Sequence, residues 1–306
     1  MRSSAYRTSR AALLRAVPHP PQPSHPWPDL TDETATAVGD WLEWLADVWR
    51  DEDVAEAITY ASRDLAAQVG TVLSASAPPP RRVRATVLAV VRYLLRAQER
   101  PTPFGFFAGV VPAVFGAATA VVWGDDHVAV ARAGAPWLAD LIVHLESCPD
   151  LLARLPLVAN STATVRGDRL IIPHQPSEQG TGTVEVSLHH TAPLQTVMSQ
   201  ARSPVCFVEL AAVLQAQFPG VSAETVTGML TELVARRVLI SSLHAPATVP
   251  DALAYLIQQL HRVGADQIEG IAELVAMLAL IHDELQKHNR VAGRPVGALT
   301  AALPGQ

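Results

Sequence analysis

The amino-acid sequence predicts an α+β fold, in which a helical region precedes a region of short strands and further helices. Apolar residues recur every three or four positions between residues 32 and 99, which is typical of amphipathic helices. After residue 156 the pattern changes to short apolar runs separated by turn residues, which is typical of strands. The chain has 306 residues, of which 49% are hydrophobic, and this is enough for about two buried cores. We expect a mixed α/β part at 1–155, a winged-helix-like module at 156–243 and a helical C-terminal piece at 244–306.

The composition excludes several classes of protein. Charged residues make up 17% of the chain and its net charge is −6, so it is neither a disordered acidic chain nor a generally basic nucleic-acid binder. The two cysteines, Cys148 and Cys206, have no CxxC spacing, which argues against a disulfide scaffold and fits a reducing cytoplasm. No stretch approaches the roughly 18 uncharged apolar residues of a membrane span. The sequence therefore predicts a cytoplasmic protein that is not transmembrane.

Signatures of metal binding, cofactor binding and serine-hydrolase catalysis are absent from the sequence. It contains no GxGxxG, Walker or GxSxG motif. Its most conspicuous histidines lack the helical i, i+4 spacing beside an acid or a cysteine that a metal site needs. These histidines are His19, His25, His174, His189 and His190. We therefore expect no metal site and no tightly bound cofactor.

The first half of the chain is expected to be mainly helical. A proline-rich stretch at 18–28 cannot be helical, and Pro101 ends a helix because a residue before proline is disfavoured in the α region. A hairpin is expected to turn at Gly124-Asp125-Asp126. The expected elements are helices at 32–50, 53–73, 82–99 and 137–155, a strand that ends at 115, and a hairpin that joins 118–123 to 127–131.

The second half has the layout of a winged helix, followed by further helices. Ser222 is expected to cap the third helix of the module. A winged helix can bind duplex DNA, but the exposed positions of this helix include Glu224 and Glu232, and Arg236 and Arg237 come only at its end, so a DNA-binding regulator is a remote alternative. The expected strands are 157–159, 163–165, 170–173, 183–188 and 238–241, and the expected helices are 194–201, 207–218, 222–236, 251–262 and 266–288.

A cluster of arginines marks the helix at 82–99. Six arginines and one glutamate fall between residues 81 and 100, a local net charge of +5 in a chain of net charge −6. Arg92, Arg96 and Arg100 have i, i+4, i+8 spacing, which predicts a stripe suited to phosphate or carboxylate. The opposite face, which we expect to be buried, carries Val87, Val90, Val91, Leu94 and Leu95. Spacing alone also allows a solvated face that forms ion pairs with the acidic segment at 47–56.

Residues 92–110, RYLLRAQERPTPFGFFAGV, resemble the signature of the N-terminal domain of class I lanthipeptide dehydratases. Residues 57–65 (AITYASRDL) and 13–18 (LLRAVP) resemble an early helix and the opening strand of that domain, and a weaker similarity extends to about residue 262. These enzymes glutamylate Ser and Thr of a precursor peptide with glutamyl-tRNA as co-substrate. The resemblance implies that Arg96, Arg100, Thr102 and Arg15 take part in glutamylation. We expect the other arginines of the cluster to bind the tRNA: Arg81, Arg82, Arg84 and Arg92.

The module at 156–243 resembles the peptide-recognition element of enzymes that modify ribosomal peptides, typified by the small peptide chaperone of pyrroloquinoline quinone biosynthesis. There the leader of the substrate adds an antiparallel strand beside the third strand and packs on the third helix. In the strand at 183–188 polar and apolar residues alternate. The residues expected to bind the leader peptide are Val184, Val186, Leu188, Val226, Met229, Leu230 and Leu233. The four residues on the helix could instead be ordinary core.

The resemblance also implies that this chain is incomplete by itself. The family's glutamylation unit continues well beyond 306 residues, and its elimination unit is a separate C-terminal domain. We therefore expect a fragment or a split component, inactive alone, that works with the remaining dehydratase domains or with a partner chain. The alternative is a non-catalytic module that binds only the leader peptide.

Overall fold

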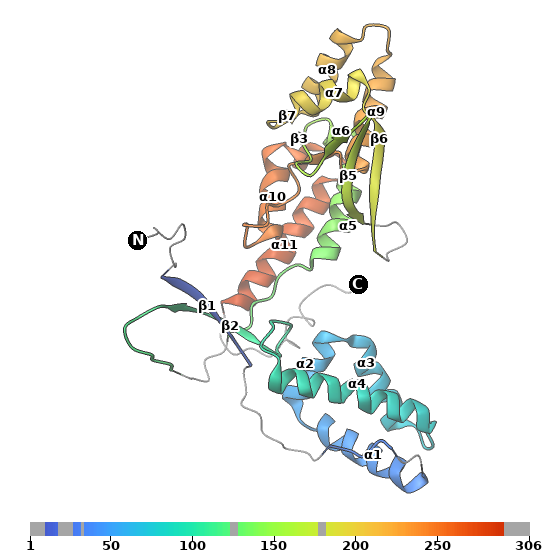
Figure 1. Ribbon diagram of the computed structural model, residues 1–306, viewed down its shortest axis with the longest axis vertical. Helices are drawn as coiled ribbons and strands as arrows, with labels where there is room; N and C mark the ends of the chain where they lie inside the picture. Colours follow the sequence, from blue (N-terminus) through green and yellow to red (C-terminus); the bar gives the residue numbers. More distant parts are fainter. Residues whose placement is uncertain (1–9, 18–26, 32–33, 123–127, 177–181, 291–306) are drawn as a thin grey trace. The chain divides into compact units, whose positions relative to one another are not determined.

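The computed structural model describes residues 10–17, 27–31, 34–122, 128–176 and 182–290, and within them the fold is α+β, as predicted (Figure 1). Eleven α-helices and three small antiparallel sheets occur in this part of the chain. The chain divides into two compact units, Met1–Ala129 with Asn289–Gln306, and Val130–His288. The boundaries predicted at 155 and 243 both fall inside the second unit.

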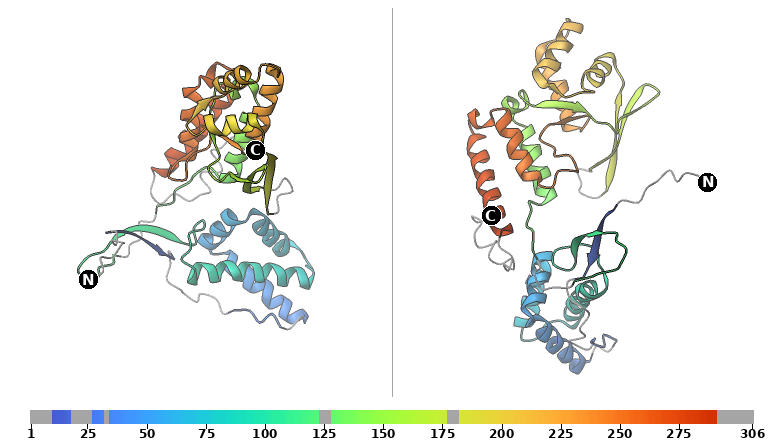
Figure 2. Two further views of the ribbon diagram at one scale, coloured as in Figure 1. Left: turned by 45° about the horizontal axis from the view of Figure 1, so that its top comes forward. Right: turned by 90° about the vertical axis from the view of Figure 1, so that its left-hand side faces the viewer.

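The first unit is built on four helices, which Figure 2 shows in blue and teal. Their apolar faces form one core, in which Trp41, Leu45, Ile58, Val69 and Val87 are at most 1% exposed. Polar side chains cap three of the helix starts, since Thr34, Asp51 and Ser62 accept hydrogen bonds from the backbone of the first turn. The helices are α1 (Ala35–Trp49), α2 (Glu52–Ala61), α3 (Arg63–Ser74) and α4 (Pro80–Glu99).

The helix predicted at 53–73 is two helices, and Ser62 separates them. Its backbone is extended, with φ −157° and ψ 94°, and its hydroxyl accepts a hydrogen bond from Leu65 N at 3.2 Å. The prediction was wrong because apolar periodicity continues across Ser62, while a serine side chain can replace the helical hydrogen bond with a cap.

A two-stranded antiparallel ribbon completes the described part of the first unit. Strand β1 (Ala11–Ala16) pairs with β2 (Gly109–Val114). Leu13 and Val114 are 70% and 81% exposed on one face, and Leu14 and Val111 are exposed on the other. The hairpin predicted after β2 is not found, because residues 118–122 and 128–131 form no strand; its turn, Gly124–Asp126, lies outside the described residues.

The second unit contains two sheets and the remaining helices. Strand β3 (Pro156–Ala159) lies between β7 (Val205–Cys206) and β8 (Leu239–Ser241). In the other sheet, β5 (Arg169–Pro176) lies between β4 (Thr164–Arg166) and β6 (Thr183–His189), as Figure 1 shows in yellow-green. The helices are α5 (Ala135–Glu146), α6 (Pro149–Leu152), α7 (Ala192–Gln200), α8 (Phe207–Gln217), α9 (Ala223–Ala235), α10 (Ala252–Arg262) and α11 (Ala272–Asn289).

Most elements predicted for this unit are present, and two predicted helices are interrupted. The helix at 137–155 is divided into α5 and α6, because Pro149 starts a new short helix. The helix at 266–288 begins as a 3₁₀ turn, η1 (Ala265–Gln267), and α11 starts only after Gly270, which has φ +79°. Ser222 caps α9 as predicted, since its hydroxyl accepts from Thr225 N at 3.2 Å.

Candidate functional site

Helix α4 presents one buried face and one cationic face. Pro80 occupies its first turn, where the missing N–H costs nothing, and Val83, Val87 and Val90 are fully buried. Leu95, which the sequence predicts to be buried, is 40% exposed because it lies near the end of the helix, beyond the last fully buried contact. The helix therefore packs most tightly along its first three turns, and residues 96–98 near its C-terminal end are half-buried.

The arginines of α4 are not neutralised within the described part of the chain. Arg81, Arg82, Arg84, Arg92 and Arg100 are exposed, and Arg96 is half-buried. None of the six guanidinium groups lies within 4.0 Å of a carboxylate of a described residue. In the acidic segment at 47–56, Asp47 instead pairs with Arg50 at 2.5 Å. The ion pairs that the alternative interpretation requires are therefore not found among these residues.

The predicted stripe of three arginines holds for Arg92 and Arg96 but not for Arg100. Arg100 is the residue after α4, and its φ of −113° and ψ of 95° are extended. Pro101 causes this change, since its ring disfavours the α conformation of the residue before it. Arg100 therefore leaves the helical stripe and leads into the turn that follows.

Arg96 is packed against the turn formed by residues 101–107. Its guanidinium carbon lies 4.4 Å from the centre of the Phe104 ring, a cation–π distance, and Nη2 donates to the carbonyl oxygen of Thr102 at 3.5 Å. Its Nε is buried and has no acceptor among the described residues. The turn closes through a hydrogen bond from Phe107 N to the Phe104 carbonyl, and Gly105 has φ +53°. Thr102 is exposed.

Arg15 lies on the two-stranded ribbon. It is exposed, and the register places it opposite Val110 of β2, three residues after the buried Phe107. The chain therefore leads directly from the turn at 101–107 into the strand that pairs with Arg15.

Strand β6 is an edge strand of its sheet within the described residues. His190 N donates to the Asp168 carbonyl at 2.7 Å. In an antiparallel pair every second residue bonds to the partner strand, so this bond and the register show which residues of β6 face β5. By this alternation Val186 and Leu188 turn their N–H groups toward β5, and Ser187 turns its N–H and C=O toward the free edge. The Arg169 guanidinium covers part of that edge, because it donates to Ser187 Oγ at 2.5 Å and to the Ser187 carbonyl at 2.9 Å.

The residues expected to bind a leader peptide divide into surface and core. On β6, Val184 is 45% exposed, while Val186 and Leu188 are half-buried. On α9, Val226, Leu230 and Leu233 are at most 5% exposed, so they form part of the core of the unit. Met229 alone of the four helix residues is half-buried. Of the predicted leader-binding residues, Val184 on β6 is therefore exposed, Val186, Leu188 and Met229 are half-buried, and the other three residues of α9 are core.

A buried ionic network that the sequence analysis missed lies at the end of α5. Glu146 is 7% exposed, and it accepts from Ser241 Oγ at 2.7 Å and lies 3.3 Å from Arg237 Nη1 and 3.1 Å from His244 Nε2. Arg236 forms its own ion pair with Glu232. The two arginines that a DNA-binding regulator would use are thus engaged within the unit. The sequence did not reveal this network because the partners lie more than 90 residues from Glu146, and no local pattern indicates such a contact.

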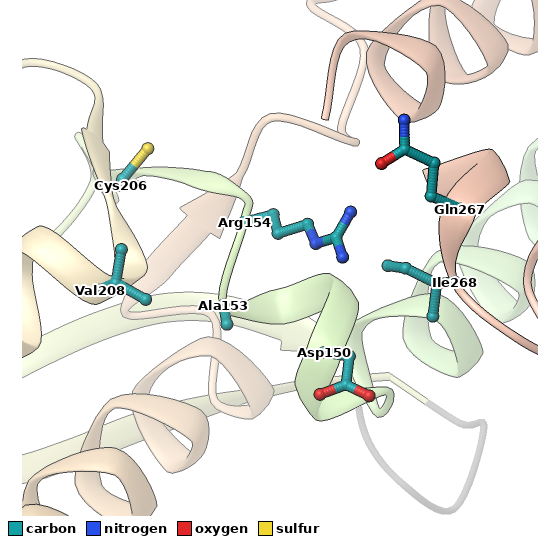
Figure 3. A pocket seen from close by; sticks show the side chains of 7 residues that line it. All are labelled: Asp150, Ala153, Arg154, Cys206, Val208, Gln267 and Ile268. Atoms are coloured by element: carbon teal, nitrogen blue, oxygen red, sulfur yellow. The ribbon is translucent and has the colours of Figure 1, made fainter. Parts of the chain in front are cut away.

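A small pocket of about 360 Å³ lies elsewhere on the second unit (Figure 3). Asp150, Arg154, Cys206 and Gln267 contribute polar groups to its wall. Arg154 is directed toward η1, since Nη1 donates to the Gly264 carbonyl at 3.0 Å. In the described part of the chain no three His, Cys, Asp or Glu side chains gather as a metal site would need, and no helix is both long and apolar enough to cross a membrane.

Comparison with known proteins identifies the family. The family described as "Lantibiotic dehydratase, N terminus" matches residues 50–303. The subtilin biosynthesis protein SpaB of Bacillus subtilis is 25% identical over 265 residues, which are 86% of this chain and 24% of that protein.

Two solved structures are also similar. The tRNA-dependent lantibiotic dehydratase MibB from Microbispora sp. 107891 has 29% identity and a TM-score of 0.68, over 86% of this chain and 26% of that chain. The glutamylation domain TbtB from thiomuracin biosynthesis has 22% identity and a TM-score of 0.39, over 88% and 34%. This chain spans about a quarter of the length of SpaB and MibB. With more than half of its residues matched, the chain belongs to the lantibiotic dehydratase N-terminus family.

Proposed function

We propose that this chain is the N-terminal part, or one component, of a tRNA-dependent lantibiotic dehydratase. In this role it binds glutamyl-tRNA and the precursor peptide, and contributes to the transfer of glutamate to Ser and Thr. Family membership and the likeness to MibB, itself a tRNA-dependent dehydratase, support the proposal. The observation that carries it is the row of exposed arginines without carboxylate partners, which ends at the turn formed by Arg96, Thr102 and Phe104.

The chemistry of glutamyl transfer suits such a cationic turn. The aminoacyl ester of glutamyl-tRNA is already activated, so the main requirement is to position a Ser or Thr hydroxyl against the ester carbonyl. Guanidinium groups bind phosphates in a bidentate way and stabilise the negative charge that develops on oxygen. Arg100 and Thr102 are exposed and free to touch the acceptor end, while Arg96 holds the turn in shape through Phe104 and the Thr102 carbonyl.

The other arginines of α4 extend the cationic surface along the helix. Arg82 and Arg96 are fourteen residues apart, so a rise of about 1.5 Å per residue separates them by roughly 20 Å. Arg81, Arg82 and Arg84 thus lie too far from the turn to contact the same phosphate as Arg100. We assign them, together with Arg92, to phosphates further along the acceptor stem.

We further propose that the leader of the precursor peptide adds a strand to the free edge of β6. Ser187 offers an outward N–H there, and Val184, Val186, Leu188 and Met229 offer apolar surface. Val226, Leu230 and Leu233 are buried and would not contact the peptide directly. The second candidate function is a module that only binds the leader, and it is favoured by one observation: β6 and α9 belong to a different compact unit from the arginines of α4.

The remaining dehydratase sequence, in the same or in a partner chain, is the proposed neighbour of the β1–β2 ribbon. A ribbon of two strands is marginally stable alone. Both of its faces expose apolar side chains, with Leu13 and Val114 the most exposed. Exposed apolar side chains gathered on one element are typical of a protein–protein contact.

Removal of two arginine charges tests the tRNA assignment. In the variant Arg96→Ala with Arg100→Ala, affinity for glutamyl-tRNA should fall, and the slope of log affinity against log salt should flatten by about 0.7 to 0.9 for each lost phosphate contact. Binding is measured by fluorescence anisotropy at four salt concentrations. The matched control is Arg50→Ala with Arg63→Ala, which removes the same charge elsewhere on the unit. Equal slopes for the two double variants would contradict the assignment.

A further inference from the structure

Phe104 is the solvent-facing phenylalanine of the segment 104–107. It is 42% exposed, whereas Phe106 is half-buried and Phe107 is 4% exposed in the helical core. An exposed apolar side chain is common on protein surfaces and needs no explanation by itself. Phe104 differs because its ring is held in place by neighbouring side chains and because exposed arginines lie near it in the sequence.

The Phe104 ring is held in one orientation by its neighbours. The Arg96 guanidinium lies over it at 4.4 Å, and the ring of Phe107 is nearly parallel to it, at 15° and 6.5 Å between centres. The backbone turn is closed by the bond from Phe107 N to the Phe104 carbonyl at 3.1 Å. At Gly105, whose φ is +53°, a side chain would be strained and its Cβ would lie 3.5 Å from Tyr60 Cδ1. A ring fixed in this way loses little conformational entropy when a ligand stacks on it.

The surroundings of the ring are cationic. Arg92 lies one helical turn before Arg96, and Arg100 is the extended residue that follows α4. Both are exposed without a carboxylate partner among the described residues. Binding to the phosphates of a duplex needs no aromatic group. An exposed aromatic ring among phosphate-binding cations is instead the combination with which proteins bind unpaired nucleotides, since a base stacks on the ring while the cations take its phosphates.

We propose that Phe104 stacks on an unpaired nucleobase at the 3′ end of the RNA acceptor strand, and so selects a single-stranded end over a blunt one. The inference rests on the proposed binding of glutamyl-tRNA at this turn and adds a base contact to the phosphate contacts. Arg96 then acts as a positioning residue, because it orients the ring that touches the base.

A pair of RNA hairpins that differ only in their bases tests this contact. Both carry a four-nucleotide 3′ overhang, ACCA in one and abasic in the other, so their phosphate charges are identical. The full chain should bind the ACCA hairpin about fivefold to 150-fold more tightly, as expected for one stacked base. Phe104→Leu should abolish this preference without changing the salt slope, and Phe104→Trp should retain it. Phe115→Leu, another exposed phenylalanine of the same unit, is the matched control and should bind as the unchanged chain does.

The outcomes separate this inference from the proposed function. If the unchanged chain binds both hairpins equally, or if Phe104→Leu keeps the preference for ACCA, the proposal that Phe104 stacks on a base is wrong. The proposal that the arginines bind phosphates is not affected by either result. Equal losses of affinity for both hairpins in Phe104→Leu would mean that the ring only supports Arg96. If the unchanged chain binds neither hairpin, the tRNA-binding function fails, and the inference fails with it. The base preference of the unchanged chain and of Phe104→Trp decides the question even if Phe104→Leu does not fold.

Discussion

Arg96 and Arg100 lie four residues apart in the sequence, yet their surroundings differ. Arg96 is half-buried and stacks on Phe104, while Arg100 has left the helix and is exposed. Loss of Arg100 therefore removes mainly a charge, whereas loss of Arg96 removes a charge and also the support of the turn. Pro101 accounts for the difference, since it forces the residue before it out of the helical conformation.

At the same scale, Glu146 is expected to contribute strongly to the stability of the second unit. Its carboxylate is buried and accepts from Ser241, Arg237 and His244. In Glu146→Ala the Arg237 charge and the Ser241 hydroxyl lose their partner, which should lower the free energy of unfolding by about 2 to 4 kcal/mol. The measurement is urea denaturation followed by circular dichroism.

An exposed ion pair provides the matched control for this prediction. Glu232 pairs with Arg236 on the surface of α9. Glu232→Ala should cost less than about 1 kcal/mol, because solvent screens an exposed pair. Similar losses in the two variants would show that burial of Glu146 does not determine its contribution.

Strand β6 carries the prediction for leader binding at the scale of the element. The N–H of Ser187 faces the free edge, so Ser187→Pro removes an edge donor without breaking the pairing of β5 with β6. Titration with a labelled leader peptide should show that Ser187→Pro no longer binds. Val186→Pro is unsuitable, because the Val186 N–H faces β5 and its loss would disrupt the sheet.

Ser187→Ala is the control for this variant. It keeps the backbone N–H and loses only the hydroxyl that accepts from Arg169. It should bind the leader as the unchanged chain does, since the outward N–H is kept and Arg169 can still donate to the carbonyl of residue 187. A folded Ser187→Pro variant with unchanged leader affinity would refute strand addition at this edge.

Asp251 links α10 to α11, which lie side by side in Figures 1 and 2, and makes this pair sensitive to acid. Its carboxylate caps α10 through Ala254 N at 2.9 Å and accepts from His282 at 3.0 Å. Burial alone would raise the pKa of Asp251, but the hydrogen bonds from Ala254 and His282 outweigh it and hold the pKa below its ordinary value of 3.8. The ionised form is favoured in the folded state, so its contribution is present above about pH 3.8 and is lost as the pH falls through the lower, folded pKa.

Thermal unfolding tests how the ionisation of Asp251 affects stability. It is measured between about pH 2 and pH 7, a range that covers the titration of a carboxyl group. Asp251→Asn keeps an N-cap acceptor but has no charge, so its stability should depend less on pH below about 4 than that of the unchanged chain. Asp168, an exposed carboxylate beside His189, serves as the control in Asp168→Asn. If Asp251→Asn and the unchanged chain lose stability in parallel on acidification, Asp251 does not contribute to the acid sensitivity.

At the scale of the whole molecule, each compact unit has a core of its own. Trp41, Ile58 and Val87 are buried in the first unit, and Leu157 and Leu230 in the second. A fragment that contains only Val130–His288 should therefore fold and bind the leader peptide with the affinity of the full chain, and it should show no salt-dependent binding of glutamyl-tRNA. Anisotropy titrations of the fragment and the full chain measure both. A folded fragment that has lost leader binding would mean that the leader site needs residues of both units.

The sequence by itself determined the α+β class and the extent of α4 and α9, while the site at the RPTPFG turn stays a prediction. These features depend on residues close together in the chain: Pro101 ends α4, Ser222 caps α9, and alternation marks β6. A resemblance over a short motif was sufficient to predict the family, which the match over residues 50–303 confirms. Local propensity and motif are properties of neighbouring residues, so they can be read from the chain directly.

Only the tertiary structure decided which side chains are buried and what they contact. Val226, Leu230 and Leu233 were equally compatible with a peptide groove or a core, and packing places them in the core. Glu146 gained its partners from residues more than 90 positions away, and the Arg96 guanidinium found the Phe104 ring only because the chain turns back after Pro101. Such contacts depend on the path of the whole chain, because burial and pairing between distant residues leave no periodic signal in the sequence.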